Sequence, residues 1–436
     1  MLSSNGKLPR WLASFGLAAA VVLVAGCGGG SGTTTSSGSS TNSTGGAVLA
    51  AGSPVSSLPA TLASNQVAVT VAGGFENAPN IPTVSVTVCE PGTSRCQTIN
   101  NVQVDTASTG LRLTLDALNY TMQTALPVEV ESVSGKPIAE CSGFADGKSW
   151  GSVRTADVTI GGETASSVPI QVMGDLPQSA AAGTSNGCAI GTLNDTSSAI
   201  AAHGILGIAA AKYDCGIVCQ TPSSGVYAGC TGSGSSTSCT DLAVLEVQQV
   251  TNPVRKFATD NTGVILNMPA VTSSGSTSAT GFLTFGIGTE SNNVLPASGI
   301  QKLTTDHYGN VQSASLSGTS VSGAFFDTGS NGLFFADSTL PSCKGATGFY
   351  CPTSTVSRTP SVTGFNGTSV SIGLSIANAL SVFEDGGFAY DNVGGPFTLG
   401  SFDFGMPFFY GRTVYVNYDP SNDGSARVAT SAYVAF

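Results

Sequence analysis

The sequence predicts an all-β protein made of two related lobes. Short runs of strand-forming residues alternate with clusters of Gly, Ser, Asn and Pro along most of the chain, as is typical of β proteins. One acidic motif, Asp-Thr-X-Ser, occurs at residues 105–108 and again at residues 327–330. A chain of 436 residues is also too long for a single hydrophobic core. The repeat therefore indicates two lobes with one copy of the motif in each.

The N-terminus predicts export and a lipid anchor. Basic residues precede an apolar run over residues 11–24, which is the pattern of a signal peptide and is shorter than the ~20 residues of a membrane-spanning helix. The run leads to Ala25-Gly26-Cys27, which resembles a bacterial lipobox. That resemblance implies a signal peptide over residues 1–26 and a lipidated Cys27, and the non-acidic Gly28 implies sorting to the outer membrane of the cell envelope, on its periplasmic or surface face. An ordinary secretory signal with an incidental Cys is the alternative.

The composition changes abruptly after the signal peptide. Residues 28–46 are almost entirely Gly, Ser and Thr, and such a segment behaves as a flexible tether. We therefore predict a linker with the lipidated Cys over residues 27–60, an N-terminal lobe over 61–292 and a C-terminal lobe over 293–436. The N-terminal lobe carries an insertion rich in Cys and Gly at residues 211–240.

The cysteines predict disulfide bonds. Removing Cys27 from the 11 cysteines leaves an even number in an exported chain, which favours disulfides over free thiols. Local bridges are predicted across two short turn-rich segments: Cys89 with Cys96, and Cys343 with Cys351. Cys141 and Cys188 remain and can pair over a longer loop. The connectivity stays open for a dense group of four: Cys215, Cys219, Cys230 and Cys239. A zinc site is the competing interpretation of that group, although no histidine supports it.

Regular structure is expected to be mostly short strands. The clearest strand-like runs are residues 83–88, 156–160, 168–172, 263–266, 282–285, 369–374, 414–418 and 432–436. Helical patterns are sparse. The best helix candidate is 241–250, where Leu242, Leu245 and Gln249 have the spacing of one helix face. A single helical turn is expected at 197–202.

Each copy of the acidic motif lies between two strand-like runs. This pattern places Asp105 and Asp327 at strand ends, each in a tight turn. Two carboxyl groups brought face to face share a proton and activate water without a metal or a cofactor. The alternative is that the motif is turn chemistry alone, because Asp, Ser and Gly are favoured in turns whatever their function.

Further segments accompany the two motifs in a fixed order. They are residues 104–108, 144–151, 158–162, 203–208, 281–286, 326–330 and 403–419. In this order they resemble the segments of the pepsin-type bilobed aspartic peptidases, and the match covers most of residues 66–436. Within that class, the chain is similar to an uncharacterised set of bacterial predicted lipoproteins.

The resemblance implies a two-lobed pepsin-like double-psi barrel architecture in which Asp105 and Asp327 are the catalytic pair. It implies that Thr106 and Thr328 brace the two turns against each other. The other site residues that it implies are Ser108 and Ser330 at the outer carboxylate oxygens, Gly329 in the second turn, and Phe144, Gly147 and Trp150 in a flap that closes over substrate. Core packing is the alternative role for Trp150 and Phe144.

Three positions depart from the pattern of that family. Ala107 replaces a glycine of the first turn, so that a methyl group is expected to strain the turn or crowd the cleft. Phe144 stands where the flap carries a tyrosine, and Met406 stands where an acidic residue is common. Three further acids lie in turn-rich segments and are expected to be solvated: Asp385, Asp391 and Asp403.

The predicted function is a membrane-anchored aspartic endopeptidase, a hydrolase that cleaves extended polypeptides with water activated by Asp105 and Asp327. No metal and no cofactor are expected, and His203 and His307, the only histidines, are expected to be structural. A formal net charge of −11 without a basic patch argues against nucleic acid as a partner, and we expect a monomer. One alternative is a non-catalytic pepsin-like envelope lipoprotein that binds peptide or glycan, and another is a purely structural envelope protein.

Overall fold

The computed structural model describes residues 58–185, 187–397, 400–418 and 432–436. The predicted signal peptide, the lipidation site at Cys27 and most of the predicted linker lie outside the described residues. In the part of the chain that is described, no helix is both long and apolar enough to cross a membrane.

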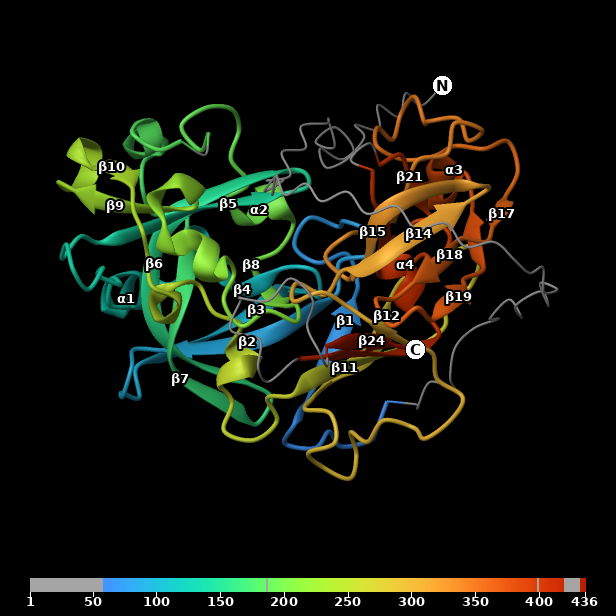
Figure 1. Ribbon diagram of the computed structural model, residues 1–436, viewed down its shortest axis with the longest axis horizontal. Coiled ribbons are helices and arrows are strands. Elements are labelled where there is room, and N and C mark those ends of the chain that lie inside the picture. The colour runs from blue at the N-terminus through green and yellow to red at the C-terminus, as the bar shows by residue number, and fades with distance from the viewer. Residues whose placement is uncertain (1–57, 186, 398–399, 419–431) are drawn as a thin grey trace, which may run out of the picture.

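The protein is built mainly of β-strands with a few short helices, which confirms the predicted fold class. Most strands of the first half of the chain form the left lobe in Figure 1, and most strands of the second half form the right lobe. The α-helices of the described residues are α1 (Tyr120–Ala125), α2 (Ser197–Ile200), α3 (Ala379–Glu384) and α4 (Met406–Phe409).

The strands of the first half are β1 (Gln66–Val71), β2 (Thr83–Cys89), β3 (Cys96–Asp105), β4 (Thr109–Thr114), β5 (Ile138–Phe144), β6 (Gly147–Ile160), β7 (Glu163–Met173), β8 (Gly204–Ile208), β9 (Tyr227–Thr231), β10 (Ser238–Asp241), β11 (Gly263–Met268) and β12 (Ala279–Phe285). Those of the second half are β13 (Lys302–Thr304), β14 (Val311–Leu316), β15 (Thr319–Asp327), β16 (Leu333–Phe334), β17 (Val356–Arg358), β18 (Ser361–Thr363), β19 (Ser369–Ser371), β20 (Leu374–Ile376), β21 (Gly394–Gly395), β22 (Phe402–Gly405), β23 (Arg412–Asn417) and β24 (Tyr433–Ala435).

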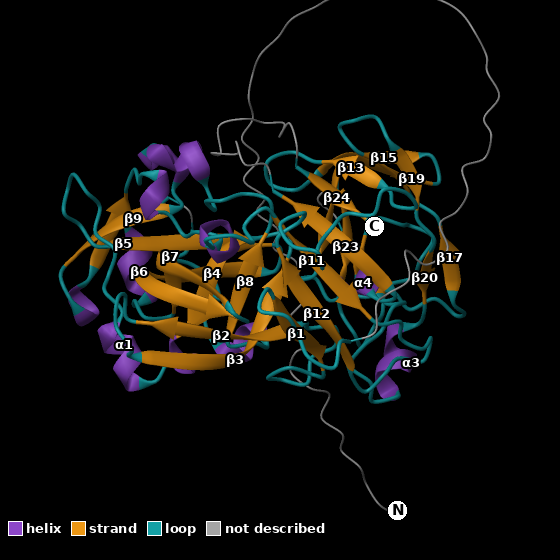
Figure 2. Cartoon of the chain, turned by 90° about the horizontal axis from the view of Figure 1, so that it is seen from below, coloured by secondary structure: helices purple, strands orange, loops and turns teal. Residues whose placement is uncertain are grey.

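One sheet continues from the first lobe into the second. Its strands follow the order β10-β9-β5-β6-β7-β4-β8-β3-β2-β1-β12-β11-β23-β24-β13. The junction is the antiparallel pairing of β11 with β23, in which Ile265 lies opposite Tyr415. Figure 2 shows β1, β12, β11 and β23 side by side between the lobes. The C-terminal strands therefore belong to the same sheet as the first lobe, across the division that the sequence placed at residues 292 and 293.

The repeat of the acidic motif corresponds to a structural repeat. In the first lobe β3 runs parallel to β8, β8 is antiparallel to β4, and β4 is parallel to β7. In the second lobe the same relations join β15, β22, β16 and β21. Asp105 lies opposite Gly207, and Asp327 lies opposite Gly405.

Both of these glycines are required by close backbone contacts. A Cβ atom at residue 207 would lie 2.8 Å from the backbone carbonyl oxygen of Ser108, and a Cβ atom at residue 405 would lie 2.0 Å from that of Gly332. Each Asp turn therefore crosses directly over a glycine of the neighbouring strand. This contact explains why an apolar-Gly segment follows each motif.

The hydrophobic core is continuous across the lobes. Val104 and Leu206 of the first lobe belong to the same buried cluster as Phe326 and Phe404 of the second. The rings of Phe326 and Phe404 stack with centroids 4.9 Å apart. Because protein interiors are densely packed, this shared core fixes the position of one Asp turn relative to the other.

The helix predicted at 241–250 is wrong. The segment holds the end of β10 and a single 3₁₀ turn, Glu246–Gln248. The backbone of this segment pairs with distant elements instead: the Leu242 N–H donates to the carbonyl of Tyr227, and the Val244 N–H donates to that of Cys219. Tertiary pairing thus overrides the apolar spacing. The predicted turn at 197–202 is confirmed as α2, and the predicted strand at 369–374 is divided into β19 and β20.

The predicted disulfides are confirmed. They join Cys89 to Cys96, Cys141 to Cys188 and Cys343 to Cys351. The open group resolves into Cys215–Cys219 and Cys230–Cys239. The zinc interpretation therefore does not hold for these four residues. Cys230 and Cys239 are cross-strand partners in β9 and β10, and β9 pairs in turn with β5. The Cys-rich insertion is thus an extension of the first-lobe sheet.

Candidate active site

The two Asp turns are locked together by a reciprocal pair of threonines. The Thr106 hydroxyl donates to the Phe326 carbonyl at 2.7 Å and accepts from the Thr328 N–H at 3.0 Å. The Thr328 hydroxyl donates to the Val104 carbonyl at 2.7 Å and accepts from the Thr106 N–H at 3.1 Å. Both side chains are buried, so these bonds are shielded from water. The brace expected between Thr106 and Thr328 is therefore present.

Three donors surround the Asp105 carboxyl group. The N–H groups of Ala107 and Ser108 donate to its Oδ1 at 2.9 and 3.0 Å, and the Ser108 hydroxyl donates to its Oδ2 at 2.5 Å. Hydrogen bonds of this kind stabilise an ionised carboxylate. Asp105 is itself buried, with 7% of its surface exposed, and its orientation is fixed on both oxygens.

The Asp327 carboxyl group has fewer donors. The Gly329 N–H donates to its Oδ1 at 2.7 Å, and Ser330 Oγ lies 2.9 Å from its Oδ2. Burial raises the pKa of Asp327 well above its usual range, and the nearby Asp105 and Asp403 carboxyl groups raise it further. The two members of the pair are therefore electrostatically different, and Asp327 is the better proton holder.

The two carboxyl groups face the same point. A Cβ atom added to Gly329 would lie 3.0 Å from Oδ1 of Asp105 and 2.9 Å from Oδ1 of Asp327. The Asp105 charge also raises the pKa of Asp327. The structure thus brings the two motif aspartates together at the lobe interface, with the Oδ1 atoms of both beside Gly329.

Ala107, the counterpart of Gly329, does not disturb the first turn. Its side chain is exposed, its backbone is not in the left-handed region, and its N–H makes the same bond to Asp105 that the Gly329 N–H makes to Asp327. The strain expected from its methyl group is absent, because the methyl points to solvent.

A third carboxyl group, Asp403, lies beside the pair and was missed. It was expected to be solvated, but only 2% of its surface is exposed. Its Oδ2 lies 2.6 Å from Ser330 Oγ, the same atom that contacts Asp327. Burial raises the pKa of Asp403 well above its usual range, and the Asp105 charge raises it further. The available signal was an acid between two phenylalanines, Phe402-Asp403-Phe404, directly before a glycine that underlies a motif turn.

The hairpin of β5 and β6, called the flap hairpin below, has a two-residue turn at Ala145-Asp146. Figure 1 shows β5 running from the first lobe toward the second. The half-buried Phe144 lies near its tip, and the Arg112 guanidinium is 5.7 Å from the ring centroid. This is within the range of a cation–π contact. Phe144 therefore contacts a charged residue of β4, the strand that follows the Asp105 turn.

Arg112 is the centre of a buried ionic cluster that was also missed. Its Nη2 atom lies 2.5 Å from Glu140 Oε1 and 3.0 Å from Asp214 Oδ2. Tyr227 donates to Asp214 at 2.6 Å. Burial and repulsion from Glu140 raise the pKa of Asp214 well above its usual range. The cluster ties the strand after the first turn to the flap hairpin and to the Cys-rich insertion. A basic residue inside the apolar run Leu111-Arg112-Leu113 was the available signal.

The flap hairpin is tethered on its outer side. Cys141 of β5 is bonded to Cys188, and the Asn194 N–H donates to the Lys148 carbonyl at 2.7 Å. Gly147 packs closely against the Asn194 side chain, which lies 2.5 Å from the position that a Cβ atom would take. Trp150 is fully buried in a small core that includes Cys141, so core packing is its role and it does not line a groove.

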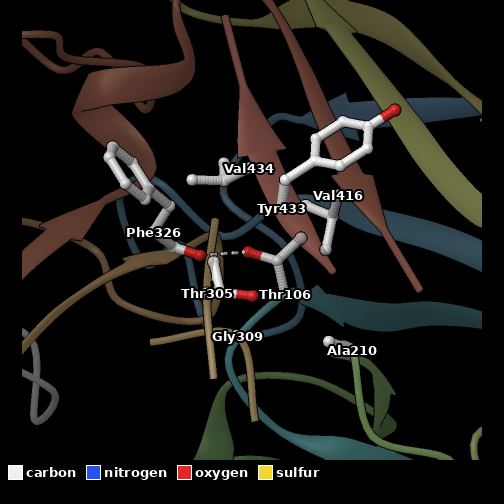
Figure 3. Close-up of a pocket in the computed structure, with 8 residues that line it drawn as sticks. All are labelled: Thr106, Ala210, Thr305, Gly309, Phe326, Val416, Tyr433 and Val434. Carbon is white, nitrogen blue, oxygen red and sulfur yellow. Dashed lines mark hydrogen bonds between the residues drawn. The ribbon is translucent and has the colours of Figure 1, made fainter. Parts of the chain in front are cut away.

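A small cavity borders the braced turns (Figure 3). Its lining residues are Thr106, Ala210, Thr305, Gly309, Phe326, Val416, Tyr433 and Val434. It has room for about one water molecule, and no carboxyl group lines it. The cavity therefore lies behind the threonine brace and is not a substrate site. Among the described residues, no group of three His, Cys, Asp or Glu side chains is placed to hold a metal ion.

Comparison with known proteins gives a family. A solved structure, the aspartic proteinase from Irpex lacteus, is similar at a TM-score of 0.46 and 18% identity, covering 86% of this chain and 97% of that one. No curated protein matches the sequence. Residues 61–436 match the model of a family described as "Protein of unknown function (DUF3443)". The match spans both lobes and both Asp turns, and the chain therefore belongs to the DUF3443 family.

Proposed function

We propose that this protein is an aspartic endopeptidase that hydrolyses extended polypeptides at the outer membrane, to which Cys27 anchors it. One observation carries the proposal: Asp105 and Asp327 face each other from two turns that Thr106 and Thr328 brace together. Two carboxyl groups that both lie beside Gly329 cannot both ionise cheaply. The pair therefore holds one proton, as water activation requires.

We infer the roles of the two carboxyl groups from their surroundings. Asp105, with its three donors, is the ionised base. Asp327, whose pKa burial and the Asp105 and Asp403 charges raise, is the acid. The pepsin pair is the standard example of such a split. The same assignment is reached here from the donors in this chain.

Hydrolysis then follows with the protons balanced. Asp105 takes a proton from water as the water oxygen attacks the scissile carbonyl carbon, and Asp327 gives its proton to the carbonyl oxygen. A neutral gem-diol results, with Asp105 protonated and Asp327 ionised. When the C–N bond breaks, Asp327 recovers a proton from a gem-diol hydroxyl and Asp105 gives its proton to the leaving nitrogen. The pair returns to its starting state.

The flap hairpin supports a role in covering bound substrate. It lies next to the strand that follows the first turn, and Phe144 near its tip offers an apolar ring. Closing such a hairpin would exclude water from the reacting bond. Phe144 has no hydroxyl to donate to substrate, so its contribution is packing alone.

Phe144 also favours a second candidate, in which the scaffold binds peptide or glycan without turnover. In that case the ring held over Arg112 grips a ligand, and the flap hairpin carries no catalytic hydrogen bond. This candidate predicts stoichiometric binding with no product. A gain of cleavage in Ala107→Gly or Phe144→Tyr would indicate a decayed enzyme.

The test of the peptidase is cleavage of a denatured protein by the purified full-length chain across acidic pH, read as new N-termini. We expect cleavage that is lost in Asp105→Asn and in Asp327→Asn. It is also expected to be blocked by a peptide with a tetrahedral hydroxyl in place of the scissile carbonyl. Asp391→Asn is the matched control, because that half-buried carboxyl lies outside the site. Cleavage retained by both active-site variants would contradict the proposal.

The anchor is tested separately. Wild-type protein grown with radiolabelled fatty acid should carry the label and sediment with outer membranes, and Cys27→Ser should do neither. Label that persists in Cys27→Ser would refute the lipid anchor without bearing on the carboxyl pair.

A further inference from the structure

The third carboxyl group breaks the symmetry of the two lobes. Asp403 lies opposite Phe325 in the pairing of β22 with β15. In the first lobe the same position is Ile205, which lies opposite Gln103 in the pairing of β8 with β3. An apolar residue in one lobe thus corresponds to a buried acid in the other. Burying an acid is costly unless it has a partner, so a partner is expected.

Ser330 is that partner, and its contacts constrain where the protons are. Ser330 Oγ lies 2.9 Å from Asp327 Oδ2 and 2.6 Å from Asp403 Oδ2. A serine hydroxyl has one hydrogen to donate. Both contacts are hydrogen bonds only if one of the two carboxyl groups is itself protonated and donates to Ser330. The unit formed by Asp327, Ser330 and Asp403 therefore holds at least one proton on a carboxyl group, in addition to the hydroxyl hydrogen of Ser330.

We propose that Asp403 is a positioning residue that shares a proton with Asp327 through Ser330 and thereby sets the upper pH limit of the pair. This inference rests on the proposed function for its catalytic consequence, but the proton sharing itself does not. When Asp403 gives its proton to Ser330 and Ser330 gives its own to Asp327, one O–H bond breaks and one forms at Ser330. Asp403 is left ionised, Asp327 is left neutral, and the total charge is unchanged.

The groups around Asp403 make proton sharing with Asp327 through Ser330 the dominant route for its proton. The titratable groups that face it are Asp327, through Ser330, and Asp105. The adjoining strand β15 carries no titratable side chain other than Asp327, and β16 and α4 carry none. Within the part of the chain that the structure describes, its second oxygen, Oδ1, has no hydrogen-bond partner. No cation among these groups neutralises it, so its charge acts on the pair.

The catalytic test compares pH–rate profiles of purified full-length variants. Asp403→Asn keeps a donor toward Ser330 but carries no charge, and Asp403→Ile copies the first lobe. Removing the charge makes Asp327 lose its proton more easily, so in both variants the alkaline limb moves to lower pH by on the order of one unit. Asp403→Asn keeps the acidic plateau, whereas Asp403→Ile lowers it. Ser330→Ala moves the limb the other way, because it removes a donor to the Asp327 carboxylate.

A second measurement does not require activity. Carboxyl carbon NMR of protein labelled at Asp Cγ, assigned with Asp327→Asn and Asp403→Asn, follows each titration directly. We expect the Asp327 resonance to titrate at lower pH in Asp403→Asn and Asp403→Ile, and Asp391→Asn to leave it unchanged. An inactive protein that shows this shift overturns the peptidase and keeps the proton sharing. An Asp327 titration that is identical in wild type and Asp403→Asn overturns the inference, whether or not the protein cleaves peptides.

Discussion

Gly329 of the second Asp turn lies against the carboxyl group of Asp105 in the first. A Cβ atom at residue 329 would lie 2.7 Å from Asp105 Cγ, a separation that real Cβ atoms essentially never show. The relationship is not reciprocal, because the equivalent Ala107 already carries a methyl group, and it is exposed. The residue at position 329 therefore packs against the carboxyl pair from the second turn. The two glycine positions of the repeated motif are not equivalent.

This asymmetry predicts opposite tolerance at the two positions. Gly329→Ala should displace the Asp105 carboxyl and reduce kcat/KM by at least tenfold, whereas Ala107→Gly should change kcat/KM by less than about threefold. Steady-state kinetics on both variants check this, and thermal unfolding shows whether Gly329→Ala remains folded. A Gly329→Ala variant with wild-type kinetics would contradict the packing described here.

The sequence predicted the paired turns because each carries its own local signal, an Asp and a hydroxyl residue between two strands. The strand beneath each turn followed from the resemblance of residues 203–208 and 403–405 to the apolar-Gly segments of pepsin-type peptidases, and the structure gives its reason in the close backbone contacts at Gly207 and Gly405. Three of the disulfides followed from short spacing or from elimination. These features were accessible because each depends on a few neighbouring residues.

The remainder depends on contacts between distant segments. Asp403 was expected to be solvated, because nothing in its own neighbourhood reports that Ser330, 73 residues away, covers it. The ion pair between Arg112 and Asp214 joins residues 102 positions apart. The helix expected at 241–250 failed for the same reason, since its N–H groups pair with Tyr227 and Cys219. A local pattern cannot report such partners.

The threonine brace predicts a loss of stability that depends on the hydroxyl group. Thr328→Val preserves the shape but removes the donor to Val104 and the acceptor for the Thr106 N–H. Leaving these buried groups unpaired should lower the free energy of unfolding by about 1–3 kcal/mol. Denaturant unfolding measures this change in free energy. The control is Thr328→Ser, which keeps the hydroxyl. Equal stability of Thr328→Val and Thr328→Ser would show that the brace contributes nothing.

The buried Arg112 predicts a pH-dependent loss. Arg112→Leu leaves Glu140 and Asp214 buried without a cation, which should cost about 3–5 kcal/mol near neutral pH. The pKa of Asp214 is already raised by burial and by Glu140, and losing Arg112 raises it further. The cost should therefore shrink as the pH falls and the carboxyl groups become protonated. Unfolding at several pH values tests this, with Glu140→Gln in the same background expected to recover part of the loss. A cost that does not vary with pH would contradict it.

The raised pKa of Asp327 predicts that this residue favours the folded state at acidic pH. Because its pKa is raised, above all by burial, its contribution to stability is complete below its unfolded value near 3.8 and is lost as the pH rises through the folded-state pKa. Asp327→Asn is always neutral. Its melting temperature relative to wild type should therefore rise as the pH increases. The lowered pKa values of Asp116 and Asp337 act in the opposite direction, but they are common to both proteins and cancel. A constant difference across pH would refute the raised pKa.

The tether of the flap hairpin predicts which motions the Cys141–Cys188 bond restrains. The bond closes a separation of 47 residues, so replacing both cysteines by Ala should cost about 4 kcal/mol if constraint of the unfolded chain dominates. It should also free the tip of the flap hairpin, because beyond Glu140 the strand β5 pairs only with β6. Hydrogen exchange at residues 142–148 should then accelerate at least tenfold, and KM for a peptide substrate should rise as the hairpin loses its closed position.

The matched control replaces Cys343 and Cys351, which are 8 residues apart in the second lobe. It should leave exchange in the hairpin unchanged. Unaltered exchange at 142–148 after loss of Cys141–Cys188 would show that the Asn194 contact with the Lys148 carbonyl and the Arg112 cluster hold the hairpin alone.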